Sequence, residues 1–312
     1  MQRPVGIKGI QAFNFNENIL AGFDLLTGRR NATWQQRAVR HPKPGQLVKS
    51  TKGEALMKVA ILAGGYGSRL AEETQVRPKP MIEIGGLPIL WHIMKMFDHY
   101  GLKEFVVALG YKGEMIKDYM KNYSQNNSHV SIDFRTQSIS YQDYDRLEWM
   151  VDLIDTGRAT LTGGRIKRLE AFLGNQTFLC AFGDGVSDLD FNKLVAFHRS
   201  HGKIATLTAV RPTARFGHVE FDGDRVKEFS EKPQTAEGWI NGGFFVFEPG
   251  IFDYLDGDQT DLSAEPMRRL ANDGQLMAYK HDSFWQCMDT LREKFVLEHL
   301  WDSNNAPWKV WT

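Results

Sequence analysis

The sequence predicts a doubly wound α/β fold with antiparallel additions in its later half. Three features predict it: short apolar runs typical of buried parallel strands, a glycine turn after the first run, and helical periodicity between runs. The run 58–63 ends in the glycine turn 64–67, periodicity follows over 88–97, and 105–109 is a second buried strand. A strand, a helix and a strand in this order predict a right-handed βαβ unit.

Later segments extend this pattern. Further strands are predicted at 130–134, 177–182, 205–209, 218–221 and 242–247. Further helices are predicted near 191–201, 265–273 and 290–302.

Residues 1–56 differ from the rest, because their apolar periodicity is poor and basic side chains are scattered among polar ones. We expect residues 1–56 to be an N-terminal extension outside the core and residues 57–312 to form the folded domain. The extension is a flexible basic arm, a remnant of cloning, or a stretch translated ahead of a start at Met57, and the last two are favoured. A nucleic-acid-binding arm is disfavoured, because basic runs are more often solvated tails.

Composition sets limits on function. Lys plus Arg and Asp plus Glu each number 38, so a net charge of zero offers no general attraction for nucleic acid or a membrane surface. No apolar stretch approaches the roughly 18 residues that span a bilayer. The two cysteines, Cys180 and Cys287, form no disulfide framework, and we expect small buried side chains rather than catalytic thiols. The expected location is the cytoplasm.

The segment from Leu62 to Leu70 points to a phosphate. Its residues up to the arginine are Leu62, Ala63, Gly64, Gly65, Tyr66, Gly67, Ser68 and Arg69. The glycines let backbone amides approach an anion without side-chain obstruction. A tight strand-to-helix connection is the plain alternative. A dinucleotide fingerprint fails at Leu70, and the spacing of a Walker loop is absent.

A basic segment, 77–82, follows closely and holds Lys79 between Pro78 and Pro80. Proline removes local freedom, so Lys79 is presented from a stiffened segment. Together, Arg69 would donate paired hydrogen bonds from its planar guanidinium to a polyphosphate, and Lys79 would supply a compact positive charge. Alone, either residue would be a surface charge.

These two motifs together resemble the signature of the nucleotide-sugar pyrophosphorylases, and the resemblance runs from Met57 to the C-terminus. A narrower resemblance is to the members that use CTP and glucose 1-phosphate. The segments that carry it are 89–96, 155–157, 162–165, 183–188, 240–246 and 285–290.

The resemblance implies a Rossmann-like, mixed-sheet nucleotide-diphospho-sugar transferase fold. It implies an enzyme that uses Mg²⁺, consumes CTP and glucose 1-phosphate, and releases CDP-glucose and diphosphate for polysaccharide precursors of the O-antigen type. It also implies a homo-oligomer, with a hexamer as one form. Neither nucleic acid nor a membrane is an expected partner.

Two aspartates match the metal positions of the family. Gly183 and Asp184 follow the apolar strand predicted at 177–182, and carboxylates at such strand ends lie where α/β sheets place ligands. Asp184 suits Mg²⁺, and Asp289 would be the second carboxylate. The plain alternatives are a turn-capping role for Asp184 and an N-cap role for Asp289 in the following helix.

The remaining site residues rest on the resemblance. Thr160 and Arg165 flank a loop, 162–164, that lies by the nucleotide in the family; for Arg165 a solvated arginine is the alternative. The sugar phosphate would contact Glu231, Lys232, Asn241 and Gly242. With Arg69, Lys79 and Asp184 as the catalytic set, the protein would align the substrates and neutralise charge.

Several alternatives stay open. A sister enzyme that uses UTP or dTTP would share the phosphate chemistry and differ in the base pocket. A non-catalytic regulatory homologue would be expected to lack Lys79, Asp184 or Asp289, and all three are present. A dehydrogenase is disfavoured by Leu70. His198 and His201 are spaced as a metal pair but are expected to be surface histidines, because no acidic or cysteine partner stands close by.

Overall fold

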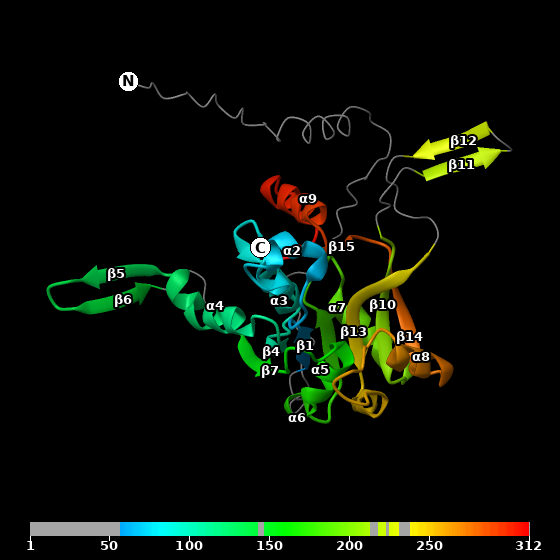
Figure 1. Ribbon diagram of the computed structural model, residues 1–312, viewed down its shortest axis with the longest axis horizontal. Helices are drawn as coiled ribbons and strands as arrows, with labels where there is room; N and C mark the ends of the chain where they lie inside the picture. Colours follow the sequence, from blue (N-terminus) through cyan, green and yellow to red (C-terminus); the bar gives the residue numbers. More distant parts are fainter. Residues whose placement is uncertain (1–56, 143–146, 213–217, 223–224, 231–237, 312) are drawn as a thin grey trace, which may run out of the picture. The chain divides into compact units, whose positions relative to one another are not determined.

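The computed structural model describes residues 57–142, 147–212, 218–222, 225–230 and 238–311. Its centre is a seven-stranded sheet in the order β14-β10-β13-β8-β1-β4-β7 (Figure 1). The bounds are β1 Lys58–Leu62, β4 Glu104–Leu109, β7 Met150–Asp155, β8 Phe178–Phe182, β10 Ala205–Val210, β13 Ile240–Phe247 and β14 Leu276–His281. Only β13 runs antiparallel to its neighbours, so the predicted doubly wound sheet with an antiparallel addition is confirmed.

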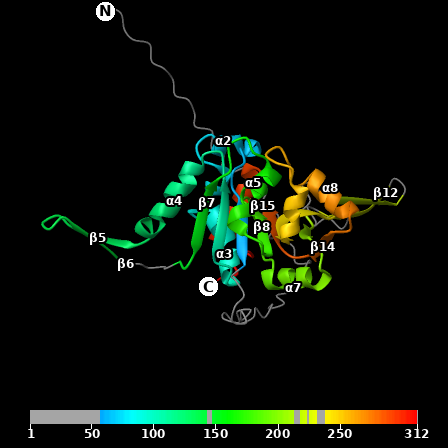
Figure 2. The same ribbon diagram turned by 90° about the horizontal axis from the view of Figure 1, so that it is seen from below.

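Helices join and cover these strands (Figures 1 and 2). The α-helices are α2 Ala71–Thr74, α3 Ile89–His99, α4 Gly113–Asn126, α5 Thr162–Arg168, α6 Glu170–Leu173, α7 Phe191–His201, α8 Glu265–Asn272 and α9 Leu291–Asp302. The 3₁₀ helices are η1 Ser68–Leu70, η2 Lys79–Met81 and η3 Pro249–Tyr254. The helices predicted at 88–97, 191–201, 265–273 and 290–302 are confirmed.

The remaining strands form two-stranded sheets. They are β2 Glu83–Ile84 with β3 Leu87–Pro88, β5 His129–Asp133 with β6 Ser138–Gln142, β9 Gly185–Ser187 with β15 Trp285–Cys287, and β11 His218–Asp222 with β12 Arg225–Ser230. The strands predicted at 130–134 and 218–221 therefore exist as β5 and β11, but neither joins the seven-stranded sheet. Figures 1 and 2 show the β5–β6 hairpin beyond the end of α4.

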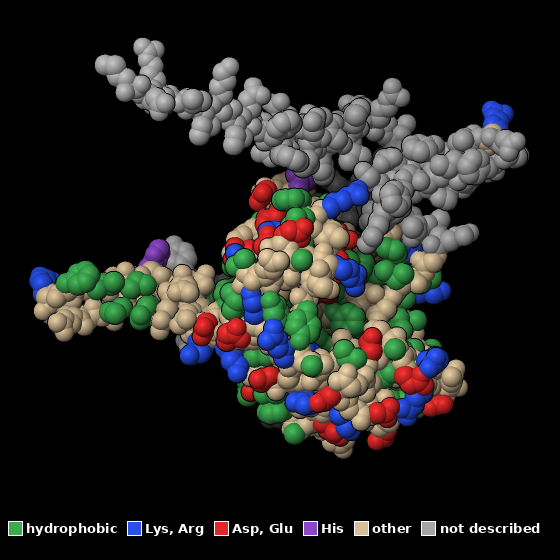
Figure 3. Space-filling view, in the orientation of Figure 1, with side chains coloured by type: hydrophobic (Ala, Val, Ile, Leu, Met, Phe, Trp, Pro, Cys, Tyr) green, Lys and Arg blue, Asp and Glu red, His purple; other side chains and the backbone are tan. Residues whose placement is uncertain are grey.

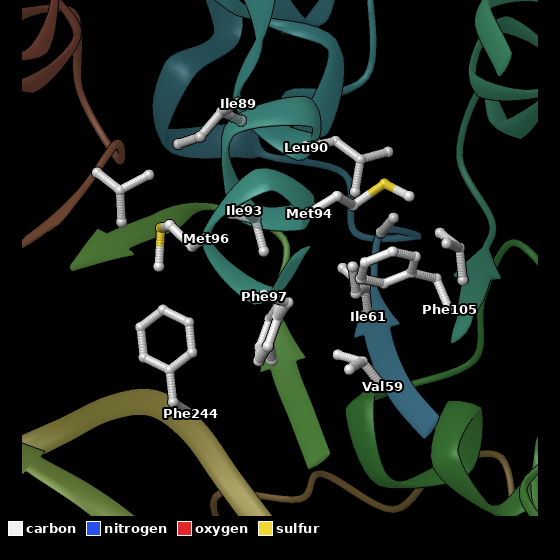
Figure 4. Packing of buried hydrophobic residues seen from close by; sticks show 14 of the residues in the cluster. Val59, Ile61, Ile89, Leu90, Ile93, Met94, Met96, Phe97, Phe105 and Phe244 are labelled. Carbon is white, nitrogen blue, oxygen red and sulfur yellow. The ribbon is translucent and has the colours of Figure 1, made fainter. Parts of the chain in front are cut away.

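Alternation along the buried strands divides the core into two layers. In β1, Val59 and Ile61 pack in one cluster with residues of α3 and α7, whereas Ala60 and Leu62 pack in the other with residues of α5 and α8. Figure 4 shows the first layer, where the helix α3 lies over β1 and β4. Burial on both faces explains why the run 58–62 is continuously apolar.

The chain order places the functional edge. From β1 the chain passes to β4 and β7 on one side, and then returns to β8 on the other. Ligands of open α/β sheets bind at the carboxyl ends of strands where the order reverses in this way, here between β1 and β8. Because β13 is antiparallel, its first residues lie at this same edge.

Candidate functional site

Backbone hydrogen bonds tie together the segments that leave the strands at this edge. The amide of Gly183 donates to the carbonyl of Leu62 at 3.1 Å, and that of Tyr111 donates to Gly64 at 3.1 Å. The amide of Thr156 donates to Leu109 at 3.0 Å. The ends of β8, β1, β4 and β7 are thereby fixed relative to one another.

The glycine turn packs directly on the Lys79 segment. Gly67 has φ +62°, and a Cβ there would lie 3.1 Å from Lys79 Cβ, so glycine is required for both conformation and space. Among the described residues, none accepts a hydrogen bond from the amides of residues 64–67. These amides are free donors of the kind that bind anions.

Lys79 lies at the centre of a charge cluster. It is 8% exposed, follows Pro78 at the start of η2, and donates from Nζ to Asp184 Oδ2 at 2.7 Å. The same ammonium donates to Asp289 Oδ1. Arg69, which is largely exposed, donates from Nη1 to Asp289 Oδ2 at 2.8 Å. Arg69, Lys79, Asp184 and Asp289 thus form a group with no net charge, called the charge cluster below.

The charge cluster shifts the pKa of its members. Burial alone would lower the pKa of Lys79, but Asp184 and Asp289 outweigh it and hold that pKa above its ordinary value. Burial tends to raise the pKa of Asp289, yet Lys79 and Arg69 overcome this and hold it below its ordinary value. At neutral pH Lys79 is therefore a cation facing the Asp289 carboxylate.

The two carboxylates fit a hard divalent cation. Asp184 and Asp289 converge on one ammonium, so a cation in its place would meet an oxygen from each. No group of three or more His, Cys, Asp or Glu side chains suited to a metal occurs within the described ranges. Mg²⁺ does not need one, because it is usually held by one or two carboxylates together with substrate phosphates and water.

The plain alternatives for the two aspartates do not hold. The N-cap of α9 is Thr290, which forms a capping box with Glu293, so an N-cap role for Asp289 is wrong. Asp184 lies between β8 and β9, where its carboxylate binds Lys79 and its carbonyl accepts from the amide of Met288. That backbone bond brings Asp184 and Asp289 to one place.

Arg165 lies beneath the glycine turn, and the expectation of a solvated arginine is wrong. It is 3% exposed and donates from Nη2 to the carbonyl of Gly64 at 2.8 Å. Its Nη1 donates to Leu109, to Thr156 and to Gly157. Arg165 thereby joins the ends of β1, β4 and β7. Direct contact with the nucleotide stays a prediction for Arg165 and for Thr160, which is buried in the loop before α5.

The expected loop at 162–164 is instead the first turn of α5, which is a correction. The amides of Gly163 and Gly164 both donate to the carbonyl of Thr260. A Cβ on Gly164 would lie 2.6 Å from Asp258 Cα. The two glycines allow the helix to pack closely against another backbone segment; they do not form a flexible loop.

The predicted sugar-phosphate residues are placed in part. Asn241 and Gly242 lie near the start of β13 at the functional edge, and Gly242 accepts a hydrogen bond from Trp285 Nε1 at 2.7 Å. Asn241 Oδ1 accepts from the amide of Gly243 at 2.9 Å. Glu231 and Lys232 lie outside the described residues.

The cysteine and histidine expectations have mixed outcomes. Cys180 is fully buried as expected, whereas Cys287 is partly exposed, and burial and nearby carboxylates raise its pKa to about 12. A thiol with such a pKa is not a nucleophile near neutral pH. His198 is buried and contacts Thr206 and Glu248, so the expectation of a surface histidine is wrong for it. No helix in the described ranges is long and apolar enough to cross a bilayer.

Residues beyond the sequence prediction also reach this edge. Tyr111 follows β4 and stacks at a tilt on Tyr66, with ring centroids 5.3 Å apart. Arg158 follows β7 and lies over both rings. Arg158 lies between the motif 155–157 and the predicted nucleotide residue Thr160, but neither signal singles it out.

Comparisons with known proteins agree with this geometry. Residues 58–292 match the nucleotidyl transferase family. The chain is 49% identical over 257 residues to glucose-1-phosphate cytidylyltransferase of Salmonella typhi, covering 82% of this chain and 100% of that protein. It is 40% identical over 256 residues to the probable glucose-1-phosphate cytidylyltransferase of Bacillus subtilis, again covering 82% and 100%.

A solved structure shares the fold. HddC from Yersinia pseudotuberculosis has a TM-score of 0.58 and 22% identity, and the match covers 78% of this chain and 99% of that chain. The resemblance inferred from the motifs is confirmed, and so is the Rossmann-like mixed-sheet fold.

Proposed function

Because the chain belongs to the nucleotidyl transferase family, we propose that it transfers the cytidylyl group of CTP to α-D-glucose 1-phosphate and releases diphosphate. The product is CDP-glucose. The observation that carries this proposal is the convergence of Lys79, Asp184 and Asp289 beside a glycine turn with free amides. The names of the relatives in Salmonella typhi and Bacillus subtilis support the choice of base and sugar.

The reaction needs no nucleophile from the protein. An oxygen of glucose 1-phosphate attacks the α-phosphorus of CTP, and diphosphate leaves in line. A phosphate monoester has a second pKa of about 6, so it is largely a dianion at neutral pH and needs no general base. The protein supplies alignment and a preorganised field for the charge that develops.

Each group of residues has a part in this scheme. The amides of residues 64–67 bind the nucleotide phosphates, and Arg69 and Lys79 neutralise the phosphates and the leaving diphosphate. Asp184 and Asp289 would hold Mg²⁺, which supplies charge neutralisation at the phosphate oxygens when bound. Asn241 and Gly242, with Glu231 and Lys232 outside the described residues, orient the sugar phosphate.

Lys79 has a second task in this scheme. Its ammonium lies between the two carboxylates and, together with Arg69, balances their charge in the structure. With Mg²⁺ bound, Asp184 and Asp289 would hold the cation, and Lys79 would face phosphate oxygens instead.

We also propose a homo-oligomer in the cytoplasm. The register of β5 and β6 pairs Val130 with Tyr141 and Ile132 with Ile139, and all four side chains are exposed. Figure 3 shows hydrophobic side chains gathered on this hairpin. An isolated two-stranded hairpin is marginal in water, so contact with a second copy of the chain would stabilise it. The mass in solution tests this.

The proposed activity is tested with each nucleoside triphosphate in turn. The protein is incubated with glucose 1-phosphate, Mg²⁺ and CTP, UTP, dTTP, ATP or GTP, and diphosphate release is followed. The proposal expects CTP to give the highest kcat/KM. A higher kcat/KM for UTP or dTTP would show a sister enzyme with the same phosphate chemistry.

A further inference from the structure

Arg158 carries a charge that the described part of the chain does not neutralise. Lys79 and Arg69 are paired with carboxylates, and the guanidinium of Arg165 donates hydrogen bonds to carbonyl and hydroxyl oxygens. Arg158 is exposed, and no described carboxylate lies within ion-pairing distance of it. It follows Gly157, whose φ of +87° turns the chain after β7. Its guanidinium therefore keeps its donors available at the edge where the nucleotide is expected.

Two tyrosines hold this guanidinium in place. The Arg158 Cζ lies 5.9 Å from the ring centroid of Tyr66 and 5.5 Å from that of Tyr111. Tyr111 is anchored, because its amide donates to Gly64 at 3.1 Å and its hydroxyl donates to the Thr74 carbonyl at 3.0 Å. Tyr66 belongs to the glycine turn and is 50% exposed. A guanidinium in cation–π contact with aromatic rings keeps its N–H donors free for other partners.

Sheet order shows which part of a nucleotide Arg158 would meet. Asp184 follows β8, and Asn241 is the second residue of β13, so the groups proposed for metal and sugar phosphate lie on one side of β1. The reacting phosphates belong on that side. A nucleotide that crosses the glycine turn then extends its ribose and base toward β4 and β7. Tyr111 and Arg158 follow these two strands.

We propose that Arg158, in cation–π contact with Tyr66 and Tyr111, binds the base of the nucleotide and selects cytosine over uracil. The inference rests on the proposed function and adds a specificity-determining residue to it. Cytosine presents adjacent acceptors, O2 and N3, which match the paired donors of a guanidinium. Uracil carries a hydrogen on N3, so one N–H of the guanidinium would meet the O2 acceptor and the other would face the N3–H donor. A site built around such a pair discriminates strongly against the mismatched base.

The test compares Arg158→Ala and Arg158→Lys with the wild type, with Arg199→Ala as the matched control. Arg199 is an exposed arginine on α7, so its loss should leave kinetics unchanged. In Arg158→Ala, kcat/KM for CTP should fall about ten- to a hundredfold, on the scale of one bidentate base contact, whereas kcat/KM for UTP should change less than about threefold. Arg158→Lys should not restore the preference, because an ammonium lacks the fork.

A binding measurement separates this inference from the proposed activity. The dissociation constants of CMP and UMP for the same four proteins need no turnover, and the wild type should prefer CMP by about tenfold or more. Equal losses for CTP and UTP in Arg158→Ala would show a phosphate or ribose contact and overturn the proposal. Full rescue by lysine would overturn it as well. If the wild type makes no CDP-glucose, but prefers CMP and the Arg158→Ala variant does not, only the proposed function is overturned.

Discussion

The ammonium of Lys79 donates a hydrogen bond to the carboxylate of Asp184 at 2.7 Å, although the two residues lie 105 positions apart in the sequence. The bond joins the segment that follows the glycine turn to the end of β8. It exists only when β1 and β8 are paired, so the charges of the proposed site come together with the fold.

Replacement of Lys79 should lower both turnover and stability. Lys79→Met leaves two partly buried carboxylates without their shared cation, which should cost about 1–3 kcal/mol of unfolding free energy. Lys79→Arg keeps the charge, but a larger planar guanidinium replaces the compact ammonium that Asp184 and Asp289 share. In both variants kcat/KM for CTP should fall by about two or more orders of magnitude.

Metal provides the control for Lys79. Because Mg²⁺ can neutralise the carboxylates that Lys79→Met exposes, millimolar Mg²⁺ should raise the melting temperature of that variant more than that of the wild type. Thermal melts with Mg²⁺ and with a chelator measure this. An unchanged kcat/KM in Lys79→Met would contradict the role of the ammonium.

Two neighbouring glycines offer a matched pair of variants. A Cβ on Gly64 would lie 2.3 Å from Arg165 Nη1, whereas a Cβ on Gly65 has no neighbour within 4 Å. Gly64→Ala should displace the guanidinium from its buried contacts and cost about 1–3 kcal/mol, and Gly65→Ala should be close to neutral. Urea unfolding of both variants measures the difference. Equal stabilities would argue against the placement of Arg165 beneath the turn.

His92 should make stability fall at acid pH. It is fully buried, donates from Nε2 to the Ile84 carbonyl at 2.9 Å, and accepts from Trp308 Nε1 at 3.4 Å. Burial, partly opposed by bonds to the Ile84 and Leu87 carbonyls, lowers its pKa from 6.5 to about 4. Between pH 6.5 and pH 4, His92 is protonated in the unfolded chain but stays neutral in the folded chain. The stabilisation is therefore complete above pH 6.5 and is lost as the pH falls toward 4.

The contribution of His92 is isolated by comparison with His92→Gln. Between pH 7.5 and pH 5.0 the wild type should lose about 2 kcal/mol more unfolding free energy than the variant, since the other histidines are common to both. Urea titrations at the two pH values give this difference. The same loss in both proteins would mean that His92 titrates normally in the folded state.

Removal of residues 1–56 should leave the enzyme intact. These residues carry none of the motifs and lie outside the described part of the chain, and β1 starts at Lys58. A protein that begins at Met57 should keep the melting temperature and kcat of the full chain, as expected for a polar terminus. Loss of folding, or of more than about half the activity, would show that the extension supports the domain.

The inner strands of the sheet were predictable, and its two outer strands were not. The inner strands β1, β4, β8, β10 and β13 are largely buried and have apolar sequences that predict strands. The outer strands β7 and β14 are half exposed and include polar residues such as Asp152 and Lys280, so no apolar run marks them. Conversely, the apolar residues of β5 predict a strand, but they do not face the core.

The charge cluster was predictable because each of its members belongs to a motif. The contact of Arg158 with Tyr66 and Tyr111 was not predictable. Tyr66 belongs to the predicted glycine turn, but Tyr111 and Arg158 carry no spacing pattern and reach it only through the strand order β1-β4-β7. The position of Arg165 was likewise hidden. Its partners are backbone carbonyls, which a sequence does not reveal.

The most direct test of the account is the formation of CDP-glucose by the purified protein, measured as diphosphate release and as the nucleotide sugar itself. With CTP, glucose 1-phosphate and Mg²⁺, the wild type should release one diphosphate for each CDP-glucose formed, and a chelator should stop the reaction. Asp184→Asn and Asp289→Asn should each reduce the rate by about two or more orders of magnitude. No CDP-glucose from the wild type, or near-normal turnover in Asp184→Asn with Mg²⁺ present, would contradict the account.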